Sequence, residues 1–150
     1  MTLGAYYVQA HSFAIEPLLA SIPVGLLIAA VLWINEFPDM DADNAVGKKT
    51  LVLRLGYARS IRAYVGMVVT AYILIIVYAL LEIFSPGITS LTSLIALLSL
   101  PFAAKAIKIL RVNYRDPHAI IPANANTIFL HLSFGVLAIL GFAIGAALGL

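Results

Sequence analysis

The chain has 150 residues, of which 63% are hydrophobic and only 11% are charged, and its mean hydropathy is +1.04. A soluble domain must cover its core with polar surface, so this composition excludes that class and indicates a protein of the lipid bilayer. The net charge of +2 is too small to indicate a nucleic-acid partner, and the absence of cysteine excludes disulfides and thiol chemistry.

The first segment, Leu3 to Gln9 (LGAYYVQ), is typical of the end of an apolar element that begins upstream. Four uncharged runs follow, each near or above the roughly 20 residues that a helix needs to cross the hydrocarbon. They are Pro17 to Asn35, Ala63 to Leu81, Ile83 to Ala104 and Pro117 to Leu150. Lipid admits only helices and closed barrels, and strand-like alternation is absent. We therefore predict one all-α integral membrane domain over residues 1–150, a bundle with about four transmembrane helices.

The first span should end near Asn35, because Pro38 disfavours helical geometry in the residue before it. A helix of about two turns is then expected from Pro38, with the aspartates in its first turns and Gly47 as its C-cap. The other spans are expected to begin after Arg59, after Gly87 and near Asn126, the third with a kink at Pro101.

All basic residues fall into two segments, one after the first span and one after the third. They are Lys48, Lys49, Arg54, Arg59, Arg62, Lys105, Lys108, Arg111 and Arg115. With four spans these segments lie on the same side of the membrane. The positive-inside rule then predicts a multi-pass protein of the cell (inner) membrane with both segments in the cytoplasm and both termini outside.

Four of the acidic residues lie within eight positions, Glu36 to Asp43. On a helix Asp39 and Asp43 share a face and Asp41 points away, whereas in a loop all three could converge. Such a group of carboxylates needs cations, and Mg²⁺ is commonly held by one or two carboxylates together with substrate phosphates. The segment therefore predicts a site for Mg²⁺ and an anionic phosphate ligand.

Three cations follow the aspartates, and they suit a polyphosphate that the metal bridges. They are Lys48, Lys49 and Arg54. An EF-hand calcium loop is excluded, because Asn44 and Thr50 occupy the positions of its glycine and its bidentate glutamate. The remaining alternative is a solvated loop whose acids and bases pair with one another.

The segment NEFPDMDADNAVGKKTLVLRLG closely resembles the second aspartate-rich motif of the UbiA superfamily of intramembrane prenyltransferases. That motif is roughly N-x-x-x-D-x-[DE]-x-D-x-x-x-G-K-x-T-L-x-x-x-x-G. The residues that match it are Asn35, Asp39, Asp41, Asp43, Gly47, Lys48, Thr50, Leu51 and Gly56. LGAYYVQAHS and PANANTIFLHLSFG are also similar to the branch that prenylates 1,4-dihydroxy-2-naphthoate, a menaquinone precursor.

The resemblance implies an enzyme with about nine helices, in which two aspartate motifs hold Mg²⁺ and grip a polyprenyl diphosphate. Ionisation of the diphosphate then alkylates an aromatic quinone precursor, with 1,4-dihydroxy-2-naphthoate as the expected acceptor. It implies that Asp39 and Asp43 are metal ligands and that Asp41 is a further ligand or a base. The implied substrate-binding residues are Asn35, Lys48, Lys49, Arg54, Tyr7 and Gln9.

The first motif of the family, N-D-x-x-D, does not occur in this sequence. We therefore expect a carboxy-terminal half that is inactive alone and needs an amino-terminal half carrying that motif. Two alternatives stay open. One is another acceptor, namely 4-hydroxybenzoate, haem, chlorophyllide or a glycerol-phosphate lipid. The other is a non-catalytic membrane subunit that binds a divalent ion.

Several other residues have a structural interpretation beside a functional one. Tyr7 could belong to an interfacial aromatic belt instead of a substrate cavity. His131 is a candidate functional residue, or a neutral histidine bonded to a neighbouring helix. Packing or an interfacial position is expected for Tyr64, Tyr72 and Tyr78, and close helix packing for Gly141, Gly145 and Gly149. Asn124 and Asn126 are expected to cap the last span, with contact of one of them to the acceptor or the diphosphate as the alternative.

Overall fold

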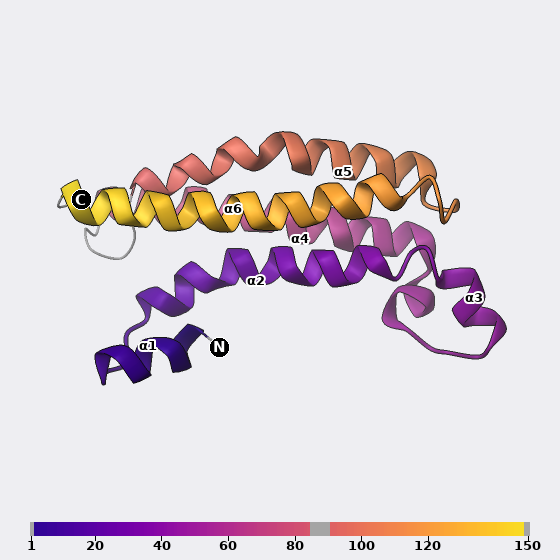
Figure 1. The fold of residues 1–150 in the computed structure, drawn as a ribbon, viewed down its shortest axis with the longest axis horizontal. Coiled ribbons are helices and arrows are strands. Elements are labelled where there is room, and N and C mark those ends of the chain that lie inside the picture. The colour runs from indigo at the N-terminus through magenta and orange to yellow at the C-terminus, as the bar shows by residue number, and fades with distance from the viewer. Residues whose placement is uncertain (1, 85–90, 149–150) are drawn as a thin grey trace.

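The structure, a computed structural model, describes residues 2–84 and 91–148. All regular elements of this part of the chain are helical, so the predicted all-α class is confirmed. In chain order they are α1 (Thr2–Ala10), α2 (Glu16–Asn35), α3 (Met40–Ala45), α4 (Leu51–Phe84), the 3₁₀ helix η1 (Leu91–Ser99), α5 (Leu100–Asn113) and α6 (Ile121–Leu148). Figure 1 shows the long helices side by side in one bundle, with α3 beyond one end.

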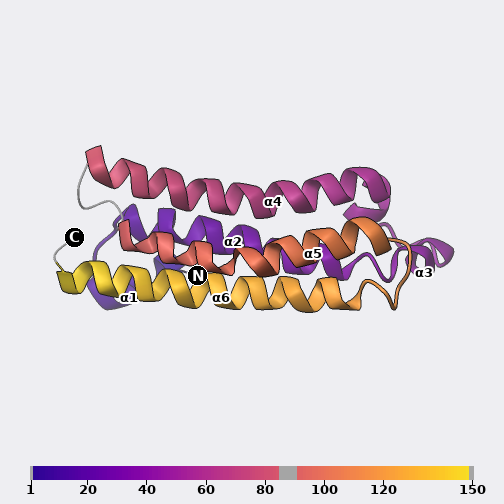
Figure 2. The same ribbon diagram turned by 90° about the horizontal axis from the view of Figure 1, so that it is seen from above.

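Within residues 2–84 and 91–148, four helical segments are long and apolar enough to cross a membrane, which confirms the predicted number of spans. They are Pro17–Asn35, Leu51–Glu82, Leu91–Asn113 and Ile121–Leu148. The connection from α5 to α6 lies at the same end of the bundle as α3, while α1 and the end of α6 lie at the other end (Figures 1 and 2). The two basic segments therefore share one end, as the charge pattern predicts.

The boundaries differ from the predicted ones at the aspartates and at the second span, and a third predicted boundary is untested. The helix at the aspartates covers only Met40–Ala45, and Gly47 follows its C-cap residue with a φ of 72°. The second span extends back to Leu51 across a break at Gly56, where φ is 72° and ψ is 165°. The predicted start of the third span near Gly87 lies outside the described residues.

The third span changes its helix type next to a proline. It is a 3₁₀ helix up to Ser99 and an α-helix from Leu100, with Pro101 in the first turn of α5. A proline has no N–H to donate, so it is tolerated at a helix start and disrupts a helix interior. The irregularity expected at Pro101 therefore takes the form of a new helical start.

Two tyrosines bridge the bundle interior. Figure 2 shows α4 and α6 on opposite sides of the bundle. The hydroxyl of buried Tyr64 on α4 lies 2.6 Å from that of Thr127 on α6, and the ring of Tyr72 meets the ring of Phe134 edge to face at 5.5 Å. Thr127 donates its own proton to the carbonyl of Ala123, so Tyr64 must be the donor to Thr127. The packing role predicted for these tyrosines is confirmed, and Tyr78 is also buried.

Gly141 marks the closest approach between α6 and η1. A Cβ atom at this position would lie 2.5 Å from the carbonyl oxygen of Thr92 and 2.7 Å from the Cα of Ser93. Gly145 is buried one turn further on, and Gly149 lies outside the described residues. The predicted role of this glycine row in close helix packing is therefore confirmed at Gly141.

We expect Gly141→Ala to lower the free energy of unfolding by about 1–3 kcal/mol, because the new methyl group meets backbone atoms that cannot rotate away. Gly135→Ala is the matched control, since a Cβ there meets nothing within 4 Å. The control should be neutral or slightly stabilising, because alanine has the higher helix propensity. Unfolding of both variants by SDS in detergent micelles measures the difference, and equal stabilities would contradict the close packing.

Candidate functional site

The aspartate segment is attached to the end of the bundle by two apolar side chains. α2 ends at Asn35, and the chain then turns through Phe37 into α3. Phe37 and Met40 are 2% and 3% exposed, so both belong to the core. The residues between and after them face outward, which leaves Asp39 and Asp41 exposed. Because Phe37 and Met40 are buried, the carboxylates of Asp39 and Asp41 lie on the surface at the end of the bundle.

The backbone of α3 separates the three aspartates as the helical alternative predicts. The N–H of Asp43 donates to the carbonyl of Asp39 at 2.8 Å, so these residues lie one helical turn apart. Asp41 is turned away, and its Oδ1 accepts a hydrogen bond from the Tyr57 hydroxyl at 3.3 Å. Within the described residues no three acidic or histidine side chains converge on one point. This chain therefore offers Mg²⁺ two carboxylates one turn apart, a share that fits a metal also bound by phosphates.

One carboxylate already has a cationic partner. Lys48 Nζ lies 2.8 Å from Asp43 Oδ2, and the backbone N–H of Lys48 donates to the carbonyl of Asp43 at 2.9 Å. The hydrogen bond that the Lys48 ammonium donates to the Asp43 carboxylate raises the pKa of Lys48 above its ordinary value. Lys49 and Arg54 are exposed on the same segment. The pairing of acids with bases that was the alternative interpretation thus occurs at Asp43.

The remaining motif residues shape the backbone. Thr50 starts α4, because its hydroxyl accepts the N–H of Leu53 at 3.3 Å. Gly47 and Gly56 both have φ of 72°, in the left-handed region that glycine adopts without strain. Gly47 thus turns the chain between α3 and α4, and Gly56 breaks α4. The sequence predicted the role of Gly47 at the end of the short helix, but it did not predict that Thr50 and Gly56 also shape the backbone.

Side-chain hydrogen bonds stabilise the backbone around the break at Gly56. The hydroxyl of buried Ser60 donates to the carbonyl of Val52 at 3.0 Å, across the interruption. The indole N–H of Trp33, in the last turn of α2, donates to the carbonyl of Ser60 at 3.0 Å. These bonds join the end of α2 to the start of the long part of α4. In the sequence, the possible signals for this contact are Trp33 and Ser60, two side chains able to donate hydrogen bonds on either side of the aspartate segment.

Asn35 contacts the start of α6. Its Oδ1 accepts a hydrogen bond from Asn124 Nδ2 at 2.9 Å. α6 begins at Ile121, so the predicted capping role of Asn124 and Asn126 is wrong: both lie within the helix, and the Asn126 amide donates back to the carbonyl of Pro122 at 2.6 Å. The last span thus begins five residues before the predicted start near Asn126.

Two buried oxygens near Asn35 have no hydrogen-bond partner within the described residues. They are Glu36 Oε2 and Asn124 Oδ1. Sequence reasoning counted Glu36 among the acidic residues but assigned it no role. Its position directly after Asn35 makes it a fourth carboxylate at this end of the bundle.

Tyr7 and Gln9 lie far from the aspartates. Both are exposed on α1, and the ring of Tyr7 stacks on Phe13 at 4.7 Å. α1 packs on α2 at the end of the bundle opposite α3 (Figure 1). The 20 residues of α2 span roughly 30 Å at 1.5 Å each. The structure therefore does not bring these two residues together with Asp39 and Asp43.

His131 lies in the middle of α6 within a membrane span. Its Nδ1 is buried and has no hydrogen-bond partner in the part of the chain that the structure describes. The bond from this nitrogen to a neighbouring helix, which the structural interpretation expected, is thus not seen there.

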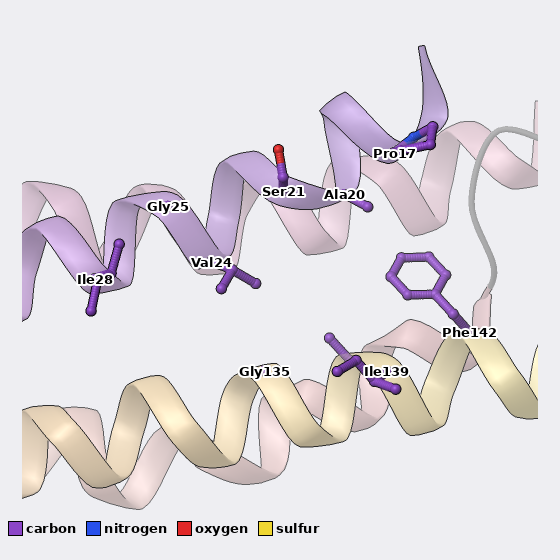
Figure 3. Close-up of a pocket in the computed structure, with 10 residues that line it drawn as sticks. Pro17, Ala20, Ser21, Val24, Gly25, Ile28, Gly135, Ile139 and Phe142 are labelled. Carbon is purple, nitrogen blue, oxygen red and sulfur yellow. The ribbon is translucent and has the colours of Figure 1, made fainter. Parts of the chain in front are cut away.

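An open apolar cleft of about 590 Å³ runs between the first half of α2 and the second half of α6. Figure 3 shows Val24 of α2 and Phe142 of α6 pointing into it, while the hydroxyl of Ser21 points away. Gly25 and Gly135 widen it by lacking side chains. The cleft lies in the half of α2 remote from α3, so an extended apolar ligand could occupy it while a polar end reached toward the aspartates.

The sequence of the chain is similar to the sequences of known membrane enzymes. The UbiA prenyltransferase family matches residues 1–120. The 1,4-dihydroxy-2-naphthoate octaprenyltransferase of Escherichia coli (strain K12) is 32% identical over 139 residues, which are 93% of this chain and 43% of that protein. The protein of the same name in Haemophilus influenzae is 34% identical over 144 residues, 95% of this chain and 44% of its own length.

A related activity is named for a third relative. The 2-carboxy-1,4-naphthoquinone phytyltransferase of Synechocystis sp. is 28% identical over 139 residues, 93% of this chain and 44% of that protein. The chain thus spans less than half the length of these relatives and matches their carboxy-terminal part. No solved structure matches the chain.

The ion pair at Asp43 predicts a pH effect. A raised pKa means that the pair stabilises the fold at neutral pH and that this contribution is lost as the pH rises through the pKa of Lys48. We expect Asp43→Asn to lower that pKa and so to raise the rate at which the neutral amine of Lys48 is acetylated. Site-resolved mass spectrometry after acetylation measures the rate, with the exposed Lys105 of α5 as internal control. An unchanged ratio of the two rates would contradict the pairing.

Proposed function

Because the chain belongs to the UbiA prenyltransferase family, we propose that it carries part of the active site of a membrane enzyme that transfers a polyprenyl group to an aromatic acceptor. The observation that supports this best is the exposed acidic helix α3, followed by cations, at the end of an apolar bundle. We propose that the other aspartate motif comes from the part of the relatives' length that this chain does not match.

The roles of individual residues follow from their chemistry. Asp39 and Asp43 would hold Mg²⁺, with Asp41 as a further ligand or a base. When bound, the metal supplies positive charge to the oxygens of the prenyl diphosphate. Lys48 and Lys49 would stabilise the negative charge that develops on the departing diphosphate. Release of Lys48 from Asp43 would free both groups for this purpose.

The proposed reaction conserves charge and electrons. The allylic carbon–oxygen bond breaks and its electron pair leaves with the diphosphate, while an electron pair of the aromatic ring forms the new carbon–carbon bond. The ring then loses a proton, or its carboxylate as carbon dioxide, and becomes aromatic again. Asn35, Arg54, Tyr7 and Gln9 are further proposed substrate contacts, with Tyr7 and Gln9 serving parts of a substrate remote from the diphosphate.

The apolar cleft between α2 and α6 suits the isoprenoid tail. Its described walls are almost entirely aliphatic and aromatic, and it is open on one side. Asp39 follows Val24 by fifteen positions, along the rest of α2 and the turn after it. A tail of several isoprene units would therefore connect the cleft with the aspartates. Burial of such a tail contributes about 25 cal/mol for each Å² of apolar surface removed from water.

We propose 1,4-dihydroxy-2-naphthoate as the acceptor. The relatives from Escherichia coli and Haemophilus influenzae both carry that compound in their names, and the Synechocystis relative names a related naphthoquinone. A panel of acceptors that also contains 4-hydroxybenzoate separates this proposal from other activities of the family.

The decisive test is Asp39→Asn in a polypeptide that joins this chain to the amino-terminal part of the Escherichia coli relative. Transfer of a radiolabelled prenyl group to 1,4-dihydroxy-2-naphthoate in membranes should fall at least about 100-fold, because one metal ligand is lost. Lys105→Gln on α5 is the control and should keep its activity. Turnover of the Asp39→Asn protein near that of the unmutated protein would refute the proposed site.

The proposed orientation places α3 in the cytoplasm of the cell and α1 outside, at the inner membrane. The chain has no cysteine, so a single introduced cysteine is the only thiol that a maleimide can label. In Ala45→Cys, on exposed α3, the thiol should react with an impermeant maleimide only in inside-out vesicles. In Phe13→Cys, at a position 78% exposed before α2, it should react only in right-side-out cells. The reverse pattern would overturn the orientation.

A further inference from the structure

A second pocket of about 600 Å³ opens beside the break in α4, at the end of the bundle that carries α3. Residues from the start of α4 and from the loop after α5 line it. Three of them are arginines, Arg59, Arg62 and Arg115, so we name it the arginine pocket. All three arginines are exposed, and no carboxylate lines the pocket. The proposed transferase reaction assigns no role to any of them.

Aromatic rings hold one arginine in place. The guanidinium carbon of Arg115 lies 5.8 Å from the ring centroid of Tyr57 and 5.6 Å from that of Tyr114. The two rings are themselves 5.2 Å apart. A guanidinium that stacks on a ring face keeps its N–H edges free to donate. Arg115 is therefore positioned and still able to bind an anion.

The other two arginines share a face of α4. Arg59 and Arg62 are three residues apart, which places them next to each other on a helix. Neither forms an ion pair within residues 2–84 and 91–148. The nearby carboxylates are engaged elsewhere: Asp41 accepts the Tyr57 hydroxyl, and Asp116 accepts the backbone N–H groups of His118 and Ala119, both at 2.9 Å. Neither carboxylate forms an ion pair with the arginines, and three guanidinium charges stand against two nearby carboxylates, so the pocket keeps a net positive charge.

The composition of the arginine pocket distinguishes its ligand from a metal-bound diphosphate. Mg²⁺ requires oxygen ligands, and this pocket supplies none from a carboxylate. A singly charged phosphodiester instead suits several guanidinium groups without a metal. The lining also includes Leu55 and Ile61, which can contact the apolar part of the same molecule.

The position of the pocket indicates where such a molecule comes from. The pocket lies in the first turns of the membrane span Leu51–Glu82 and just beyond the end of the span Leu91–Asn113, and its three arginines are exposed. Lipid headgroups occupy this depth, and basic pockets between spans bind anionic headgroups. We propose that the arginine pocket binds the phosphate of an anionic phospholipid from the surrounding membrane. The bound lipid also contacts Tyr57, whose hydroxyl reaches Asp41, so lipid occupancy and the geometry of α3 are linked.

The test measures lipid retention by native mass spectrometry. The 150-residue chain is released from micelles that contain equal amounts of phosphatidylglycerol and phosphatidylcholine. The unmutated chain should retain phosphatidylglycerol in preference. The double variant Arg59→Gln/Arg62→Gln should lose that preference about tenfold, because two of the three charges near the phosphate are gone.

Lys105→Gln/Lys108→Gln is the matched control. It removes the same charge from two exposed residues at the same spacing on α5, outside the pocket, and should change retention less than about twofold. Far-UV circular dichroism confirms that each variant is folded. An equal loss in both double variants, or an unmutated chain without preference, would overturn the proposal. Displacement of the lipid by micromolar pyrophosphate with Mg²⁺ would also overturn it, since the pocket would then be a diphosphate site.

A second measurement uses the unmutated chain alone. Photoreactive phosphatidylglycerol with its reactive group in the headgroup should cross-link to residues 55–62 or 114–115, and peptide mapping identifies the attachment. Cross-links confined to other segments would refute the pocket. Lipid retention and cross-linking are both read without Mg²⁺ and without turnover, and Mg²⁺ enters only the displacement control, so failure of this proposal is distinct from failure of the proposed transferase function.

Discussion

The bundle depends on the absence of water inside a membrane. A polar side chain in that interior must find a partner on a neighbouring helix, and Tyr64 and Tyr72 do so at Thr127 and Ser99. Each such bond contributes on the order of 1 kcal/mol in a membrane protein, and the tyrosine rings fill the space between helices whose backbones lie apart. Two residues of α4 thus set the spacing between α4 and its neighbours, and the close approach at Gly141, two turns beyond Phe134 on the same face of α6, sets the spacing between α6 and η1.

A rigid bundle allows a polar segment to be displayed at its edge. Phe37 and Met40 are buried in the core and so fix the position of α3 relative to the bundle, although the outer face of α3 is solvated. Asp43 meets Lys48 there, and the arginine pocket opens nearby on α4. One end of the molecule therefore collects both the carboxylates suited to a metal and the guanidinium groups suited to phosphate. The opposite half is apolar.

Local patterns were sufficient to predict what depends on local physics. Uncharged runs predicted four spans, and the spacing of Asp39 and Asp43 predicted that they share a helical turn. The start of α6 was mispredicted, because Asn124 resembles a cap until its partner on α2 is known. The remoteness of Tyr7 and the role of Gly56 could not be predicted, since they depend on the path of the backbone and not on residue type. Binding of substrate and metal by these residues stays a prediction.

The bond between Trp33 and Ser60 brings together two points that are 27 residues apart in sequence. The acidic helix, the lysines and Thr50 all lie within the intervening stretch, which leaves the bundle and returns to it at almost the same place. Changes of length or composition inside such a closed loop leave the register of α2 against α4 intact, because the loop ends are fixed by their own bond. The segment is in this sense tethered at both ends, so the bundle holds the acidic helix in place through Trp33 and Ser60 as well as through Phe37 and Met40.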